Sequence, residues 1–540
     1  MNKFLTISLC AVMAMAAKAS PPPDLIARIH FVGAEQISAD TNSAALTNFF
    51  CSAEAQALRE QTLNKLSHFP YTWFKSRLAA VASDGADQLR PLLDDLLKSE
   101  WILEIRDTTN GVPETALAIR LDTARAKLWQ ENLAGVLQSW THLPAGKTST
   151  GWLLKKDLPP NLIRFIRAGD WVVLSCGENE LPLSDDIVRR VLAEKRPAPF
   201  GRNYWLNVEA DWPRLARWFP PLKAFDFPKI ELQFIGRDGD LWSNGRFILS
   251  QPLSPLEKWR LPTSVFHQPM VSFTAVRGIG SWLERQSWAQ PYEIQPPPNQ
   301  FFIWALPQVP LQTFAAAPVP DATAALTQLD AKLSAVLVKN SKNLFFNTIK
   351  EEMTNGQIAW HGLPFIAPFV RTLHEPEGDF LFGGFFPNPP RSEALPPALL
   401  QQLNTPNLVY YHWEITGDRL KELPELSQFM LLLTRHNQFN PQSTTGKWLN
   451  HVGPTLGPAV TTVTQTGPNE LNFFRKSPGG LTAIELVTLA NWLEATNFPG
   501  CDLRMPPPRV RPMRPPPNMP GTPGKPAPAA PAPASPAVPH

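Results

Sequence analysis

The chain has 540 residues, of which 43% are hydrophobic, and its formal net charge is +3. Seven of its 50 basic residues lie in residues 1–19 and 504–540, two segments without any acidic residue, so the body between them holds 43 basic and 47 acidic residues. A protein that binds nucleic acid carries an excess of positive charge on its folded body. We therefore exclude nucleic acid as a partner.

Residues 1–19 have the pattern of a cleavable secretory signal. Lys3 supplies a positive start, Phe4 to Met15 is an apolar run of about a dozen residues, and Ala17-Lys18-Ala19 places small residues at a cleavage site. The alternative is a membrane anchor, but the run is shorter than the roughly 18–20 apolar residues that cross a bilayer. We expect cleavage after Ala19 and a mature chain in the periplasm or outside the cell, with no transmembrane segment.

Three cysteines remain after that cleavage: Cys51, Cys176 and Cys501. An odd number leaves at least one thiol free or in an intermolecular bond, and the sequence does not say which. No Cys-x-x-Cys pair points to zinc or redox chemistry, and we expect no cofactor. The fold therefore depends on an apolar core.

Proline-rich segments divide the rest of the chain. The body is too long for one average domain, and it has proline-rich breaks at 291–298 and 386–397. We take the first as the main boundary, which predicts an α+β domain over residues 20–290 and a second over 291–503. Residues 504–540 are rich in Pro, Ala and Arg and cannot bury enough surface to fold, so we expect a disordered, extended tail. This tail is either a spacer or a basic arm that contacts an anionic envelope surface.

Three turns predict β-hairpins and hence largely antiparallel sheets. Asp238-Gly239 suits a type I′ turn between Ile230–Phe234 and Leu241–Leu249. Similar pairs of apolar runs flank Ala168-Gly169 and Glu377-Gly378, which predicts two further hairpins.

Amphipathic helices alternate with these strands. Asp122 is a predicted N-cap before an apolar stripe that includes Trp129 and Trp140, and Asp321 precedes a similar stripe. Thr482 and Glu485 form a predicted capping box, and the helix that follows contains Trp492. The chain has 18 tryptophans; we expect most of them in the core, while stacking platforms for sugars and a cavity lining remain open alternatives.

Two stretches resemble each other inside the chain. In 204–215 and 410–420, strand aromatics precede Glu209 or Glu414, and then Arg214-Leu215 or Arg419-Leu420. We therefore expect the fold class to be α+β, with mostly antiparallel sheets packed against amphipathic helices and two related halves.

Catalytic signatures are few. His374, Glu377 and Asp379 lie within six residues and are the only metal-ligand candidates, although Pro376 and Gly378 explain the same segment as a surface turn. The sequence lacks a Gly-x-Ser-x-Gly nucleophile elbow. We therefore assign no catalytic or cofactor-binding residue.

Three short segments resemble a family of large exported bacterial proteins of unknown function. They are Ile29-His30-Phe31-Val32-Gly33, Phe473-Phe474-Arg475-Lys476-Ser477 and Leu481-Thr482-Ala483-Ile484-Glu485-Leu486. The resemblance implies an α+β envelope protein without an assigned activity.

These observations favour an exported, non-enzymatic binding or scaffolding protein of the bacterial envelope. One alternative is a carrier that holds an apolar ligand in an aromatic-lined cavity. The other is a hydrolase whose site is assembled from distant carboxylates and histidines. An enclosed cavity in the folded body would favour the carrier, and a solid core would count against it.

Overall fold

The fold is known from a computed structural model. It describes residues 25–74, 84–108, 112–157, 160–197, 204–218, 227–266, 269–286, 294–307, 312–340, 350–354, 356–362, 366–386, 397–422 and 440–500. The expected signal at 1–19 and the tail at 504–540 lie outside these ranges.

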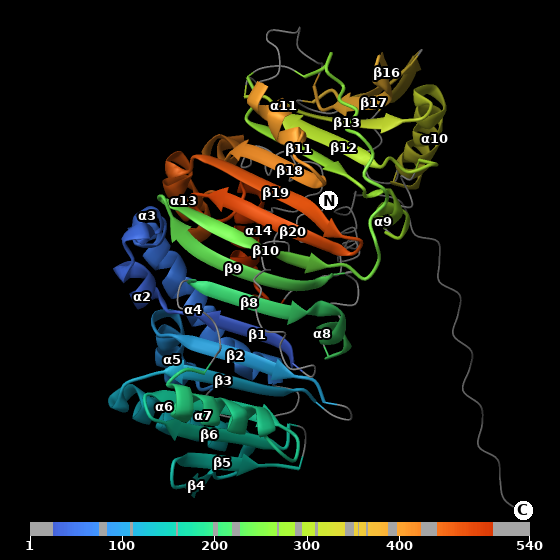
Figure 1. Ribbon diagram of the computed structural model, residues 1–540. Helices are drawn as coiled ribbons and strands as arrows, with labels where there is room; N and C mark the ends of the chain where they lie inside the picture. Colours follow the sequence, from blue (N-terminus) through green and yellow to red (C-terminus); the bar gives the residue numbers. More distant parts are fainter. Residues whose placement is uncertain are drawn as a thin grey trace, which may run out of the picture. The chain divides into compact units, whose positions relative to one another are not determined.

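The described strands form one antiparallel sheet of twenty strands, shown in Figure 1. The first ten are β1 (Leu25–Phe31), β2 (Trp101–Arg106), β3 (Glu114–Arg120), β4 (Gly146–Thr148), β5 (Gly151–Lys155), β6 (Leu162–Ala168), β7 (Trp171–Gly177), β8 (Leu206–Asp211), β9 (Lys229–Arg237) and β10 (Asp240–Ile248). The other ten are β11 (Ser272–Arg277), β12 (Gln300–Ala305), β13 (Thr313–Val319), β14 (Lys350–Thr354), β15 (Gln357–His361), β16 (Phe369–Glu375), β17 (Gly378–Gly384), β18 (Leu408–Ile415), β19 (Pro458–Gly467) and β20 (Glu470–Ser477).

The strand order repeats. Pairing runs β4-β5-β6-β7-β3-β2-β1-β8-β9-β10 in the first half of the sheet, residues 25–248. It runs β14-β15-β16-β17-β13-β12-β11-β18-β19-β20 in the second half, residues 272–477, which is the same order with each number raised by ten. The halves join through β10 and β20, the last strand of each.

Twelve helices lie in the described part of the chain. They are α2 (Ala34–Ala39), α3 (Ala44–Phe50), α4 (Ala53–Phe74), α5 (Ala86–Lys98), α6 (Thr123–Thr141), α7 (Pro182–Glu194), α8 (Trp212–Trp218), α9 (Gly280–Glu284), α10 (Ala322–Asn340), α11 (Pro397–Leu403), α13 (Thr444–Val452) and α14 (Ala483–Glu494). None of these helices combines the length and the apolar character that crossing a bilayer requires.

The helices pack on both sides of the sheet. In the first half α7 packs on one side, here called the α7 side, while α5 and α6 pack on the other. In the second half α11 packs on the α7 side and α10 on the opposite side. Helices α13 and α14 of the second half pack together with α3 and α4 of the first, which adds a second contact between the halves.

The local sequence signals are confirmed. β9 and β10 are joined by Asp238 and Gly239, both with positive φ, as a type I′ turn requires. Asp122 accepts a hydrogen bond from the amide of Arg125 at the start of α6, and Thr482 and Glu485 form a complete capping box at the start of α14. Asp321 likewise accepts from an amide in the first turn of α10.

Two details differ from the expectation. The β6–β7 turn is Gly169-Asp170, because Ala168 already pairs with Trp171, and the β16–β17 turn is Pro376-Glu377. The strands also form one continuous sheet, in which β11 pairs with β12 across residue 291. The domain boundary expected there stays a prediction.

Candidate functional site

The predicted metal-ligand candidates lie on the β16–β17 hairpin. His374 and Asp379 are directly opposite, and the Nδ1 atom of His374 lies 2.7 Å from Oδ1 of Asp379. Asp379 also accepts a hydrogen bond from the amide of Ala322 at the start of α10. The contact with His374 and this amide lower the pKa of Asp379. Glu377 lies in the turn, and the structure does not bring it to this pair.

This hairpin is tied to its neighbours. Glu375 accepts hydrogen bonds from the amide and hydroxyl of Ser264 and from the hydroxyl of Thr263. Among the residues that the structure describes, no group of three His, Cys, Asp or Glu side chains could hold a metal ion. The acids of this hairpin therefore serve turn and helix contacts in the present arrangement.

A row of charged side chains crosses five strands of the first half on the α7 side. Its members are directly opposite one another on β2, β1, β8, β9 and β10: Glu104, Arg28, Glu209, Glu231 and Arg246. All except Arg246 are at most 9% exposed. A buried charge is tolerated only when it is paired, so the pairing within this row decides its stability.

The pairing is close at both ends of the row. Arg28 donates to Glu104 at 2.7 Å, and Arg246 donates to both oxygens of Glu231 at 2.8 and 2.9 Å. Arg190 of α7 adds contacts to Glu104 at 2.6 and 3.1 Å, which tie the helix to the sheet.

The middle of the row is less well balanced. Glu209 is directly opposite Glu231, and its nearest charge partner is Arg28, whose Nη1 lies 3.5 Å from Oε2 of Glu209. Burial raises the pKa of Glu209; the charge of Arg28 opposes this increase and the charge of Glu231 adds to it. Two carboxylates opposite each other repel, so Glu209 is the least favourable member of the row.

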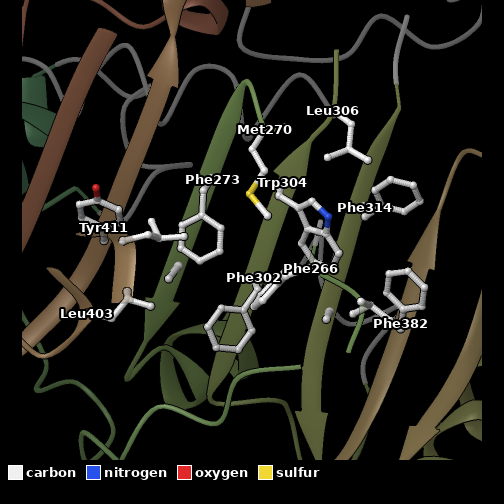
Figure 2. Close-up of a cluster of buried hydrophobic side chains, with 14 of the residues drawn as sticks. Phe266, Met270, Phe273, Phe302, Trp304, Leu306, Phe314, Phe382, Leu403 and Tyr411 are labelled. Carbon is white, nitrogen blue, oxygen red and sulfur yellow. The ribbon is translucent and has the colours of Figure 1, made fainter. Parts of the chain in front are cut away.

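The corresponding row of the second half is aromatic. Trp304, Phe273 and Trp413 are directly opposite one another on β12, β11 and β18, on the same α7 side. The ring centroid of Trp304 lies 4.7 Å from that of Phe266 and 5.8 Å from that of Phe382. Trp304, Phe266 and Phe382 are each at most 1% exposed. Figure 2 shows Phe266, Phe273, Trp304 and Phe382 among the side chains of this packed cluster. The aromatic cluster is therefore a packed core in the described residues.

A chain of polar contacts lies on the opposite side of β11 and β18. The hydroxyl of Thr274 lies 2.8 Å from Nδ1 of His412, whose Nε2 lies 3.3 Å from Oε2 of Glu414. The other oxygen of Glu414 accepts from Thr416 and from the amide of Ala483 at the start of α14. Burial alone would raise the pKa of Glu414, but His412, the Ala483 amide and Thr416 outweigh it and lower that pKa.

The α14 helix is held by a second buried pair beside this chain. Arg475 donates to both oxygens of Glu485 at 2.7 and 3.1 Å, and the two side chains are 4% and 2% exposed. Arg475 also donates to the hydroxyl of Thr461 at 2.8 Å. The polar groups on this side of the second half thus fasten α14 to the sheet.

A polar pocket of about 710 Å³ lies between α5, the start of α6 and the β6–β7 turn. Its lining includes Asp94, Asp95, Asp122 and Asp170 with the cations Lys98, Arg120 and Arg125. Asp95 accepts three hydrogen bonds from Arg125 and one from the indole of Trp129. The most buried carboxylate of the pocket is therefore already satisfied within the protein.

The sheet has a further surface where the two halves meet. It is formed on the α7 side by β9, β10, β20 and β19, and we call it the midline face. In Figure 1, α7 and α11 lie in front of other strands, and no described helix is drawn in front of these four. Its side chains, which are half-buried or exposed apart from Glu231, are Glu231, Gln233, Ile235, Trp242, Asn244, Arg246, Thr462, Thr464, Asn472, Phe474 and Lys476.

The sequence indicated only part of these features. Along β9, the apolar residues Ile230, Leu232 and Phe234 alternate with Glu231 and Gln233, which lie on the opposite side of the strand. The sequence pattern did not indicate that Glu231 is buried or that Arg246 lies directly opposite Glu231. Arg28 was missed, because a single arginine in a strand reads as a solvent-facing residue.

Comparison with known proteins adds no relative: no protein-family model, no curated protein and no solved structure matches this chain.

Proposed function

We propose that the protein is an exported, non-enzymatic binding or scaffolding protein of the bacterial envelope, and that it binds through the midline face. The observation that carries this proposal is the contrast between packed and open parts of one sheet side. The aromatic cluster of the second half is filled by its own rings, whereas Asn472 on the midline face is exposed to solvent. An open polar surface on a rigid sheet is suited to contact with a partner.

Export rests on the sequence pattern of residues 1–19. We propose that the chain is cleaved after Ala19 and acts in the periplasm or outside the cell. The basic, proline-rich tail at 504–540 serves as a spacer or contacts an anionic envelope surface. Mass determination of the N-terminal peptide from envelope fractions tests the first point: a peptide that begins at Ser20 supports it, and intact Met1 in the cytosol contradicts it.

The packed aromatic cluster counts against an apolar carrier. Trp304, Phe314 and Phe382 are at most 1% exposed and lie with ring centroids 5.7 to 5.8 Å apart. Organic extraction of the native protein followed by mass spectrometry tests this point. We expect an empty extract; a lipid recovered in a one-to-one ratio would support the carrier instead.

The Thr274–His412–Glu414 chain supports hydrolase activity as the second candidate, because a hydroxyl, an imidazole and a carboxylate are in contact in the order that nucleophilic catalysis uses. We rank it second because Glu414 is engaged by α14. Turnover of p-nitrophenyl esters that His412→Gln abolishes would move this candidate to first place.

We also infer that the two halves arose by internal duplication. Their strand orders agree over ten strands, and α6 and α10 each begin after an aspartate cap between the third and fourth strand of the half. Helices α7 and α11 each connect the seventh and eighth strands and pack on the same side.

Photo-crosslinking in cells tests the binding surface. A photoreactive residue in place of Asn472 reports on the midline face, and one in place of Ile303 is the control, because Ile303 is 43% exposed and lies on the opposite side of the sheet. We expect a discrete adduct from position 472 and none from position 303. Absence of an adduct at 472, or equal adducts at both positions, would overturn the proposal.

A further inference from the structure

The aromatic part of the midline face lies on β10 and β20. Trp242 and Phe474 meet edge to face with ring centroids 5.3 Å apart, and both are half-buried. The guanidinium of Arg237 lies 4.7 Å from the centre of the Trp242 ring, and Nζ of Lys476 lies 5.8 Å from it. The two rings therefore form a small edge-to-face aromatic cluster, with the Arg237 guanidinium over the indole, on an otherwise polar surface.

Amide side chains extend this aromatic cluster along a row of directly opposite residues on neighbouring strands. Asn244 is directly opposite Gln233 on β9 and Phe474 on β20. The next residue of this row is Asn207 on β8, which is 1% exposed and whose side-chain oxygen and nitrogen both lack a hydrogen-bond partner. An unpaired buried amide costs free energy. Asn207 lies beneath the surface, so Gln233 and Asn244, which are only half-buried, are the amides of this row that a ligand can reach.

The charges of the midline face neutralise one another. Lys476 lies 3.2 Å from Asp240, and Arg246 lies 2.8 Å from Glu231 and 3.4 Å from Glu470. Arg237 lies 3.4 Å from Asp238. A surface of paired charges offers no net attraction to an anionic or a cationic polymer, so charge complementarity favours a neutral ligand.

We propose that the midline face binds a neutral glycan chain, with Trp242 as the stacking residue and Asn244 and Gln233 as hydroxyl partners. The inference rests on the proposed binding function and names its ligand class. Indole presents a large flat apolar face, which suits the C–H face of a sugar ring. Amides both donate and accept hydrogen bonds, as sugar hydroxyls do.

Calorimetric titration of the exported chain, purified intact, tests the ligand class. The probes are cellohexaose and the hexamer of N-acetylglucosamine, with polygalacturonate as the anionic comparison. We expect at least one neutral probe to bind and Trp242→Ala to weaken it by about tenfold. Trp242→Phe keeps an aromatic ring, so we expect it to weaken binding of the neutral probe less than Trp242→Ala does. Asn244→Ala removes a hydroxyl partner, and we expect it to weaken binding independently of the ring.

Trp360→Ala is the matched control, because Trp360 is also half-buried but lies on β15, near the other end of the second half. Circular dichroism of each variant confirms that it is folded. Binding of polygalacturonate alone, or equal losses in Trp242→Ala and Trp360→Ala, would overturn the glycan inference.

The crosslinking experiment separates this failure from failure of the proposed function. If position 472 gives an adduct in cells while no neutral probe binds, the glycan inference is wrong and the binding function stands. If position 472 gives no adduct and no probe binds, both are wrong.

Discussion

The two halves of the sheet repeat one strand order but fill the same side with different chemistry. In the first half, the row through β2, β1 and β8 consists of Glu104, Arg28 and Glu209; in the second, the row through β12, β11 and β18 consists of Trp304, Phe273 and Trp413. The backbone pairing is thus compatible with either a charged or an aromatic layer. What differs is the contact that holds the layer: directional ion pairs in one half and ring packing in the other.

The largest expected effect comes from the aromatic row. Trp304→Ala removes a fully buried ring from contacts with Phe266, Phe314 and Phe382, and we expect the free energy of unfolding to fall by about 4 kcal/mol. Urea denaturation followed by hydrogen exchange should show β11–β13 opening before β1–β3. A loss below about 1 kcal/mol would mean that the cluster is not a packed core.

A substitution in the charged row of the first half should reduce stability almost as much. Glu104→Ala leaves Arg28 and Arg190 without their closest carboxylate, and we expect the free energy of unfolding to fall by about 3 kcal/mol, with faster exchange in β1, β2 and α7. Glu470→Gln is the control, because this carboxylate is 39% exposed and its pair with Arg246 should be worth less than about 1 kcal/mol. Equal losses in both variants would contradict the importance of burial.

Glu414 and Glu209 sharpen the comparison because the sequence places them in similar stretches. Glu414→Gln weakens the contacts that hold α14, and we expect a loss of about 1.5 kcal/mol at neutral pH. The pKa of Glu414 is lowered by folding, so its contribution is present above the unfolded pKa and is lost as pH falls through the folded pKa. Unfolding measured from pH 7 to pH 3 should show the gap to wild type closing in acid. A gap that stays constant would contradict this assignment.

Glu209→Gln should act in the opposite direction and by the smallest amount. The pKa of Glu209 is raised by folding, so its cost in stability builds up as pH rises above the unfolded pKa and is complete once pH exceeds the folded pKa. We expect the glutamine variant to be more stable than wild type by about 1 kcal/mol at pH 7, with the difference vanishing below the unfolded pKa of about 4.3. Destabilisation at pH 7 would show that the Arg28 contact outweighs the repulsion from Glu231.

These two glutamates also show why sequence alone did not place the site. They follow similar aromatic residues and precede Arg-Leu, yet Glu209 lies on the α7 side and Glu414 on the opposite side. Directly opposite residues share a side of the sheet and neighbours along a strand alternate, so a shift of one residue between similar stretches reverses the side. No local pattern reports such a shift.

Local signals were otherwise reliable. The Asp238-Gly239 turn, the Asp122 cap and the Thr482–Glu485 capping box depend on residues a few positions apart, and all three are confirmed. The pairings β3–β7, β1–β8 and β10–β20 join segments far apart in the chain, and the sequence gives them no local mark. The midline face depends on the last of these, so it could not be predicted.

Trp242 illustrates the same limit for the candidate site. A tryptophan in an amphipathic strand predicts burial, and sequence could not indicate that Phe474, more than 200 positions later, lies 5.3 Å from it. Of the three tryptophans expected in the core, Trp129 and Trp140 are buried, and Trp492 is half-buried against Phe498.

The β10–β20 pairing is the most direct test of the account, because the midline face exists only if these strands join the halves. Hydrogen–deuterium exchange of the intact chain, read by mass spectrometry on peptides covering 240–248 and 470–477, measures it. We predict protection of both peptides that matches the peptides of β1 and β11, which are paired on both edges. Exchange as fast as that of the terminal strands β4 and β14 would contradict the continuous sheet and the binding surface proposed on it.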